Sequence, residues 1–362
     1  MAADLQHSPL EALHVELGGR MVPFAGWNMP VMYDSILNEH RAVRETVGIF
    51  DISHMGQFIV RGQGAGEWLN YMLANNIAKL GDGKGQYTFL LNERGGVIDD
   101  LIVYQIQTEE FLLVVNASMI PEDLAWLKKH LKDGVELLDE SEAWAGMAVQ
   151  GPESAAAFAK VFPDEILPSR NGVARMADGS MVCRTGYTGE DGFEFFCASE
   201  NGVEQFKRFV DAGAKPCGLG ARDSLRLEMC YPLNGNDLRP DRTPIEAGLG
   251  FFVDLEKGDF IGREVLAQQK SEGLKERLVA IEYVSKGAPP RAHYPVLDEA
   301  GNSLGELSSG VPSPSLGKGI GLAFLPIEHA KVGTPLQIDV RGRMVAAQVV
   351  KKPFYKPTAK NS

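Results

Sequence analysis

The sequence lacks the features that would place this chain in a membrane, in a secretory route or on a nucleic acid. No apolar run approaches the roughly 20 residues that span a bilayer. The segment from Met1 to Leu17 resembles neither a signal peptide nor an Arg-rich transit peptide, so we expect a cytoplasmic protein. Lysine and arginine number 36 against 48 acids, a net charge of −12, which argues against a broad nucleic-acid surface.

Cysteine is scarce and shows no metal-binding or redox pattern. The four cysteines form no C-x-x-C pair, and no two histidines stand at a metal-ligand spacing. We therefore predict no metal site and interpret the cysteines as buried structural thiols, namely Cys183, Cys197, Cys217 and Cys230.

The common catalytic signatures are also missing. Gly62-x-Gly64-x-Gly66 is not a dinucleotide fingerprint, and Gly317-Lys318-Gly319 does not end a P-loop. There is no G-x-S-x-G and no H-E-x-x-H. These absences argue against a nucleotide-dependent dehydrogenase, an NTPase, a serine hydrolase and a metalloprotease, so an enzyme with this sequence must take its chemistry from a co-substrate.

Hydrophobic periodicity predicts an α+β protein. Helical spacing marks residues 35–46, 65–73 and 120–131, and short strands are expected at 57–60, 87–91, 101–106 and 111–115. This order is typical of an α+β lobe with helices on one face of an antiparallel sheet. A similar rhythm of strands and helices recurs between residues 147 and 230, which suggests two related lobes.

Beyond about residue 275 the predicted helices give way to short strands separated by glycine and proline turns. This pattern predicts a small antiparallel β-barrel. We place the boundary in the polar run 268–276. The expected division is residues 1–275, with two interleaved lobes of which one covers roughly 52–140, and a barrel domain at 276–362.

A pair of acids after a glycine turn is the most informative local feature. Gly95-Gly96 is expected to supply positive-φ positions, after which Asp99 and Asp100 open a strand. Alternation puts Asp100 on the apolar side of that strand with Ile102 and Tyr104. A buried carboxylate there requires a partner or a function, so Asp100 is either a catalytic acid, or a turn acid or satisfied buried acid. Asp99 is interpreted as the structural acid.

Three further residues stand in informative contexts, each with an ordinary alternative. Glu194 lies opposite Phe193 and Phe195 on a strand, where a lone glutamate is usually solvated. Arg222 opens a helix, where a paired arginine would also fit, and His54 enters a strand, where a structural hydrogen bond is the common role.

Longer phrases of the sequence carry a family resemblance. These are FAGWNMP, VGIFDISHMGQ, GGVIDDLIVY, RTGYTGEDGFE, GLGARDSLRLE, PIEAGLGFFV, SGVPSPSLGKGIGLAF and VVKKPFYK. Together they resemble the aminomethyltransferase of the glycine cleavage system, the T-protein. The resemblance implies a three-domain cloverleaf around a tetrahydrofolate site, with two related α+β lobes and a small C-terminal antiparallel β-barrel.

The resemblance also implies an activity and a set of site residues. The carbon of an aminomethyl group on the lipoyl arm of the H-protein would pass to tetrahydrofolate, with release of ammonia. Asp100 matches the essential acid, and Glu194 and Arg222 match pterin-site positions. The remaining folate-binding candidates are Tyr187, Tyr87, Met55, Tyr104 and Tyr355. No metal, nucleic acid or membrane is implied.

The family contains other activities, and one alternative stays open. An iron–sulfur-assembly branch carries K-G-C-Y-x-G-Q-E, but Asp259 stands at its thiol position here. A folate-dependent demethylase of the same superfamily remains the alternative function. Two departures concern the pocket: the segment 167–173 has no aromatic residue, and Phe251-Phe252 stands where tryptophan is common.

Overall fold

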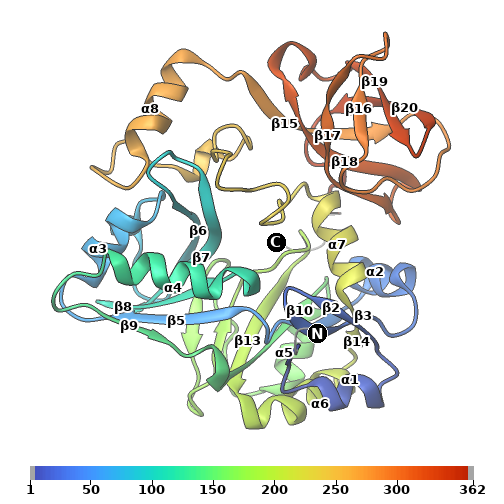
Figure 1. Ribbon diagram of the computed structural model, residues 1–362. Coiled ribbons are helices and arrows are strands. Elements are labelled where there is room, and N and C mark those ends of the chain that lie inside the picture. The colour runs from blue at the N-terminus through green and yellow to red at the C-terminus, as the bar shows by residue number, and fades with distance from the viewer. Residues whose placement is uncertain (1–4, 358–362) are drawn as a thin grey trace. The chain divides into compact units, whose positions relative to one another are not determined.

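The computed structural model describes residues 5–357, which form two compact units (Figure 1). The first unit contains the chain up to Thr88 together with Leu101–Arg222. The second contains Phe89–Asp100 and the chain from Asp223. The chain passes from one unit to the other within β6 (Lys84–Leu91), β7 (Val97–Gln107) and α7 (Leu219–Glu228).

A six-stranded sheet with the order β11-β12-β13-β10-β4-β14 forms one core of the first unit. Alternation along β13 places Phe193 and Phe195 in an apolar cluster with helices α5 and α6, and full burial of each ring contributes about 1.5–3 kcal/mol. The elements are β4 (Gly48–Asp51), β10 (Trp144–Gln150), β11 (Val173–Arg175), β12 (Met181–Cys183), β13 (Gly192–Ala198), β14 (Lys215–Pro216), α5 (Ser154–Val161) and α6 (Gly202–Asp211).

The N-terminal segment adds a three-stranded sheet and two helices to this unit. The sheet has the order β1-β3-β2, with β1 (Gln6–His7), β2 (Arg20–Phe24) and β3 (Trp27–Met32). Helices α1 (Glu11–Glu16) and α2 (Ile36–Glu45) accompany it. His14 on α1 bonds Asp51 of β4 at 2.8 Å and the Tyr33 hydroxyl at 2.8 Å, so a buried polar network ties this segment to the six-stranded sheet.

A second sheet has the order β6-β7-β8-β5-β9. Besides β6 and β7 it contains β5 (Gly56–Arg61), β8 (Glu110–Val115) and β9 (Glu136–Asp139), and helices α3 (Ala65–Met72) and α4 (Ile120–Lys129) follow β5 and β8 in the chain. Helix α4 has a proline in its first turn, acids there and lysines in its last turn, as the helix dipole favours.

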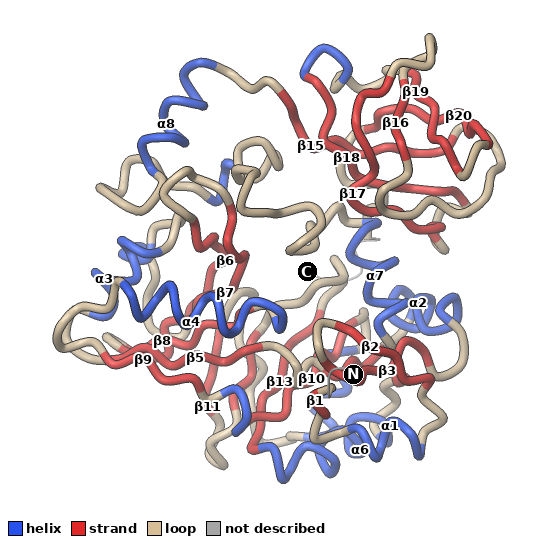
Figure 2. The backbone as a smooth tube through the Cα atoms, viewed as in Figure 1, coloured by secondary structure: helices blue, strands red, loops and turns tan. Residues whose placement is uncertain are grey.

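The second unit ends in a closed barrel. Its strand order is β15-β18-β17-β16-β19-β20, and every neighbouring pair is antiparallel. A long loop and helix α8 (Arg263–Glu272) precede it (Figure 2). The strands are β15 (Glu276–Tyr283), β16 (Pro295–Leu297), β17 (Ser303–Ser313), β18 (Lys318–Pro326), β19 (Pro335–Val340) and β20 (Arg343–Val350). Short 3₁₀ turns occur at Ile77–Lys79, Ala117–Met119, Ser141–Ala143, Ser199–Asn201, Gly250–Phe252 and Ile327–His329.

The structure confirms the α+β class and the small C-terminal antiparallel barrel. The polar run 268–276, in which we placed the domain boundary, contains the second half of α8 and the beginning of β15. Only Leu266 of that helix is buried, so its polar side chains face solvent and leave no amphipathic stripe to identify it. The four cysteines are buried free thiols, as expected. Among the described helices, none combines the length and apolar character needed to cross a membrane.

Candidate functional site

The Glu194 carboxylate is one of the predicted site groups that lie in the first unit. It sits on β13, between β10 and β12, with 8% of the residue exposed. The Thr185 hydroxyl donates to Glu194 Oε2 at 2.8 Å. Burial raises the pKa of Glu194, while the bond from Thr185 and the charge of Arg222 act in the opposite direction. A carboxylate has about four lone-pair positions, so this one keeps acceptor capacity for a ligand.

Tyr104 contacts the Thr185 hydroxyl that bonds the Glu194 carboxylate. The hydroxyl of Tyr104 lies 2.6 Å from Thr185 Oγ1, and the residue is fully buried. Its ring packs on Gly85, where an added Cβ would come within 2.2 Å of it. The sequence suggested Tyr104 as a folate contact, but its burial makes it a holder of Thr185.

Arg222 and Tyr187 form a stacked pair in the same unit. The guanidinium carbon lies 4.8 Å from the Tyr187 ring centroid, and both residues are half-buried. Arg222 is in the first turn of α7, where its backbone N–H bonds the carbonyl of Gly218. A cation held on an aromatic face is stabilised by about 0.5–2 kcal/mol, so the pair presents a fixed flat surface with a positive charge.

The loop that carries Tyr187 is fixed by two residues that sequence reasoning missed. Gln150 Nε2 donates to the Thr185 carbonyl, and Gln150 Oε1 accepts from the Thr188 hydroxyl at 2.9 Å. Arg44 donates to the Thr188 carbonyl at 2.7 Å and pairs with Glu190 at 2.9 Å, with both of these side chains more than nine-tenths buried.

The glycine spacing of this loop follows from Gln150. A Cβ at Gly186 would lie 1.9 Å from Gln150 Oε1, and one at Gly192 would lie 2.5 Å from Gln150 Nε2. Neither position has a left-handed backbone, so close approach is the requirement. The repeated glycines in RTGYTGEDGFE were the only sequence signal of Gln150, and they do not say which side chain approaches.

His54 and Met55 lie in the turn between β4 and β5. His54 is buried, and burial together with the charge of Arg222 lowers its pKa to about 4, although Asp51 opposes this shift. It is therefore a neutral ring at pH 7, packed edge-to-face on Phe24 at 5.8 Å. Met55 is half-buried beside it in sequence.

The acid pair lies on β7, in the part of the strand that belongs to the second unit. Asp99 is fully buried and Asp100 is half-buried, so the expectation that Asp100 is the more enclosed of the two is wrong. Asp99, Leu101 and Val103 on one face are all buried, whereas on the other face Asp100 and Ile102 are half-buried and Tyr104 is buried. Asp100 instead keeps access from outside the core, which a group that meets a substrate requires.

The turn before these acids also differs from expectation. Gly95 has φ +74°, but Gly96 is not in the left-handed region. Gly96 is needed for space, because a Cβ there would lie 1.9 Å from the Pro240 carbonyl oxygen. Asn92 Oδ1 accepts the N–H groups of Arg94 and Gly96 and closes the turn.

The remaining predicted residues are half-buried. Tyr87 lies on β6, and its carbonyl accepts a bond from Asn75 at 2.9 Å. Tyr355 lies after β20 in the second unit, where its N–H bonds the Glu228 carbonyl at 3.0 Å. Across residues 5–357, no group of three or more His, Cys, Asp or Glu side chains is arranged to hold a metal ion.

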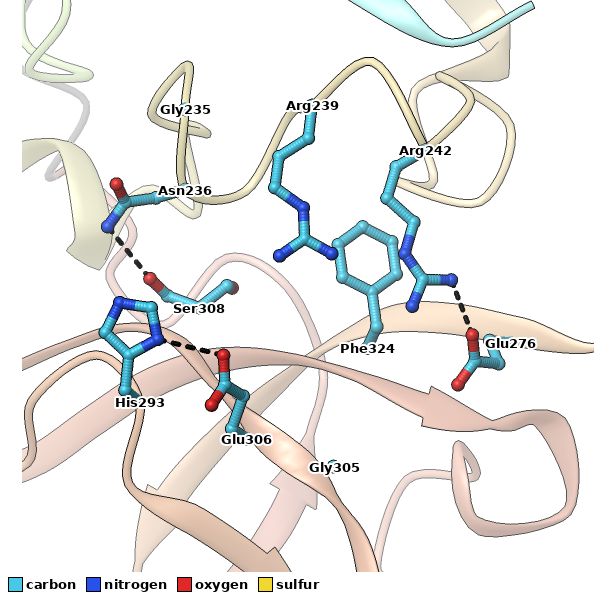
Figure 3. Close-up of a pocket in the computed structure, with 10 residues that line it drawn as sticks. All are labelled: Gly235, Asn236, Arg239, Arg242, Glu276, His293, Gly305, Glu306, Ser308 and Phe324. Carbon is cyan, nitrogen blue, oxygen red and sulfur yellow. Dashed lines mark hydrogen bonds and ion pairs between the residues drawn. The ribbon is translucent and has the colours of Figure 1, made fainter. Parts of the chain in front are cut away.

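A cavity of about 140 Å³ lies elsewhere in the second unit and contains none of these predicted residues. Figure 3 shows the guanidinium groups of Arg239 and Arg242 on either side of the Phe324 ring. The residues that line this barrel cavity are Gly235, Asn236, Arg239, Arg242, Glu276, His293, Gly305, Glu306, Ser308 and Phe324.

Two family models match the chain. The GCVT N-terminal domain matches residues 10–257, and the glycine cleavage T-protein C-terminal barrel domain matches residues 276–356. An α+β region followed by a closed barrel is thus the architecture of a GCVT-type protein. The chain belongs to the glycine cleavage T-protein family, which confirms the resemblance carried by its motifs.

Relatives named aminomethyltransferase match along nearly the whole length. The aminomethyltransferase of Geobacillus thermodenitrificans (strain NG80-2) is 44% identical over 362 residues, and that of Bacillus subtilis (strain 168) is 42% identical over 363 residues. Each match covers 97% of this chain and 99% of the relative. The crystal structure of glycine cleavage system aminomethyltransferase T from Bartonella henselae has a TM-score of 0.93 at 34% identity, covering 98% of this chain and 99% of that chain.

Proposed function

We propose that this chain is the tetrahydrofolate-dependent aminomethyltransferase of the glycine cleavage system. Its substrate is the aminomethyl group on a sulfur of the dihydrolipoyl arm of the H-protein. The carbon passes to tetrahydrofolate and bridges N5 and N10. The C–S and C–N bonds of the aminomethyl group break, and the two folate N–H protons leave with the thiol and the ammonia.

The full-length match to aminomethyltransferases carries this proposal, and the Glu194 and Arg222 surroundings support it. A pterin offers N–H donors along one edge and a carbonyl acceptor nearby. The carboxylate of Glu194 suits the donors, and the guanidinium of Arg222 suits the acceptor. Tyr187, Tyr87, Met55 and Tyr355 are proposed to line the folate pocket, with Tyr104 behind Glu194.

Asp100 is proposed as the catalytic acid. A carboxylate attracts the aminomethyl ammonium and stabilises the cationic methylene-iminium character that develops as the bonds to carbon break. It also suits proton transfer at the folate nitrogens. The half-buried position of Asp100 on β7 is compatible with both roles.

We further propose that residues 1–275 form the folate-binding region and that residues 276–362 form a separate barrel domain; residues 1–4 and 358–362 of these ranges lie outside the described part of the chain. The beginning of β15 at Glu276 and the limits of the two family matches support this division.

An ammonia-release assay tests the function. The purified chain is incubated with tetrahydrofolate and aminomethylated H-protein, and in parallel with a sulfonium or methylamine donor. We expect ammonia and methylenetetrahydrofolate only with the H-protein. Turnover of the sulfonium or methylamine donor without H-protein turnover would instead assign a folate-dependent demethylase.

A further inference from the structure

The turn of the β6–β7 hairpin rests on the loop 239–242 of the second unit. Asn92 Nδ2 donates to the Pro240 carbonyl at 2.8 Å. The Val97 N–H lies 3.1 Å from the Arg239 carbonyl and 3.0 Å from the Arg242 carbonyl. The start of β7 is thus held by backbone and side-chain bonds to this loop.

The contact between hairpin and loop leaves no room for a side chain. A Cβ at Gly96 would lie 1.9 Å from the Pro240 oxygen, which is closer than two non-bonded heavy atoms can approach. A second tie lies one residue beyond Val97, where Asn234 Nδ2 donates to the Ile98 carbonyl at 3.1 Å. The loop therefore determines where the first residues of β7 lie.

Arg242 fastens this loop to the barrel. Its Nη1 lies 2.5 Å from Glu276 Oε2 on β15, and its guanidinium carbon lies 4.4 Å from the Phe324 ring centroid on β18 (Figure 3). The side chain is only 18% exposed. A planar guanidinium that is both paired and stacked has one orientation, so the loop that carries it is fixed to two barrel strands.

Arg239 lines the same cavity without making such a link. It pairs with Asp241, two residues away, at 3.1 Å, and that acid is exposed. An exposed pair within one loop contributes about 0.2–1 kcal/mol and connects no elements. Arg239 is therefore a matched control for Arg242 in the same loop and cavity.

The charges of the barrel cavity do not favour an anion site. Arg242 is neutralised by Glu276 and Arg239 by Asp241, while Glu306 lies 2.9 Å from His293. No excess positive charge is left for a carboxylate or a phosphate. Arg242 is better explained by what it holds in place.

We infer that Arg242 is a positioning residue for Asp100. The link runs from Glu276 and Phe324 through Arg242 to the backbone contact at Val97. Asp100 follows three residues later on the same strand, a span of about 10 Å. This inference rests on the proposed catalytic role of Asp100. Since misplacement of a reacting group by about 1 Å can cost about a hundredfold in rate, loosening the loop slows the chemical step.

The test compares Arg242→Ala with Arg239→Ala in steady-state transfer from aminomethylated H-protein to tetrahydrofolate. For Arg242→Ala we expect kcat to fall about tenfold or more, with KM for both substrates within about twofold of wild type. Arg239→Ala should leave both constants unchanged. Equal kcat losses in the two variants, or a loss confined to KM, would overturn the inference.

A double mutant separates positioning from general damage. In the Asp100→Asn background, Arg242→Ala should cause no further loss of kcat. The Arg242 side chain acts by positioning the Asp100 carboxylate, which this background lacks. Additive losses would contradict a route through Asp100. Glu276→Gln weakens the same link with a smaller change, so it provides the comparison if Arg242→Ala does not fold. If Asp100→Asn itself were fully active, the proposed role of Asp100 would fail, whatever the Arg242 variants did.

Discussion

Removal of the Thr185 hydroxyl should shift the pH dependence of folate binding. In Thr185→Val, Glu194 loses the bond at 2.8 Å that stabilises its ionised form, while burial remains. A hydrogen bond to a charged group is worth about 1.5–3 kcal/mol, and about 1.4 kcal/mol corresponds to one pH unit. Loss of this bond should therefore raise the pKa of Glu194 further above its already raised value.

The direction of the pH shift follows from which protonation state of Glu194 binds the pterin. The ionised carboxylate accepts the pterin N–H groups, so affinity is present above the pKa of Glu194 and is lost as the pH falls through it. Calorimetric titration with 5-formyltetrahydrofolate between about pH 5 and about pH 8 should show this loss at higher pH in Thr185→Val. Thr108→Val, which removes an exposed hydroxyl bonded to Asp82, is the control. Superimposable pH profiles for Thr185→Val and wild type would refute the role given to Glu194.

Two further changes test the surroundings of Glu194. Gly186→Ala places a Cβ 1.9 Å from Gln150 Oε1, so we expect about 1–3 kcal/mol of lost stability in thermal unfolding and weaker folate binding. Gly81→Ala, where the added Cβ meets open space, should change neither stability nor folate binding. Wild-type stability and folate binding in Gly186→Ala would show that the loop tolerates displacement. Arg222→Ala removes the charge stacked on Tyr187 and should weaken tetrahydrofolate binding about tenfold by calorimetry. Unchanged affinity would remove Arg222 from the pterin site.

Local periodicity predicted much of the fold because the hydrophobic residues of many strands and helices follow the spacing of those elements. Alternation along 193–197 put Phe193 and Phe195 on one face and Glu194 on the other, as the structure has them. That the first face packs in the core, and that Glu194 is buried too, came from the structure. Alternation also put Asp99 and Asp100 on opposite faces correctly, but it did not predict which of the two acids is more buried. That depends on what packs against each side of β7, which local sequence does not contain.

Contacts between residues distant in sequence could not be predicted. Gln150 holds a loop 35 or more residues further along, and only glycines at positions 186 and 192 recorded the need for space. Likewise Gly96 was read as a turn residue, although its constraint is Pro240, more than a hundred residues away. The family motifs indicated the candidate site residues, whereas the residues that hold them in place came from the structure.

Single-turnover transfer by Asp100→Asn tests the central claim most directly. Wild type and variant are mixed with aminomethylated H-protein and tetrahydrofolate, and methylenetetrahydrofolate is followed in time, with folate affinity measured in parallel. Loss of one stabilising charge in a transition state costs about a hundredfold or more, so we expect a rate lower by that factor with affinity within about threefold of wild type. A near-wild-type rate with the variant would contradict the assignment of Asp100 as the catalytic acid.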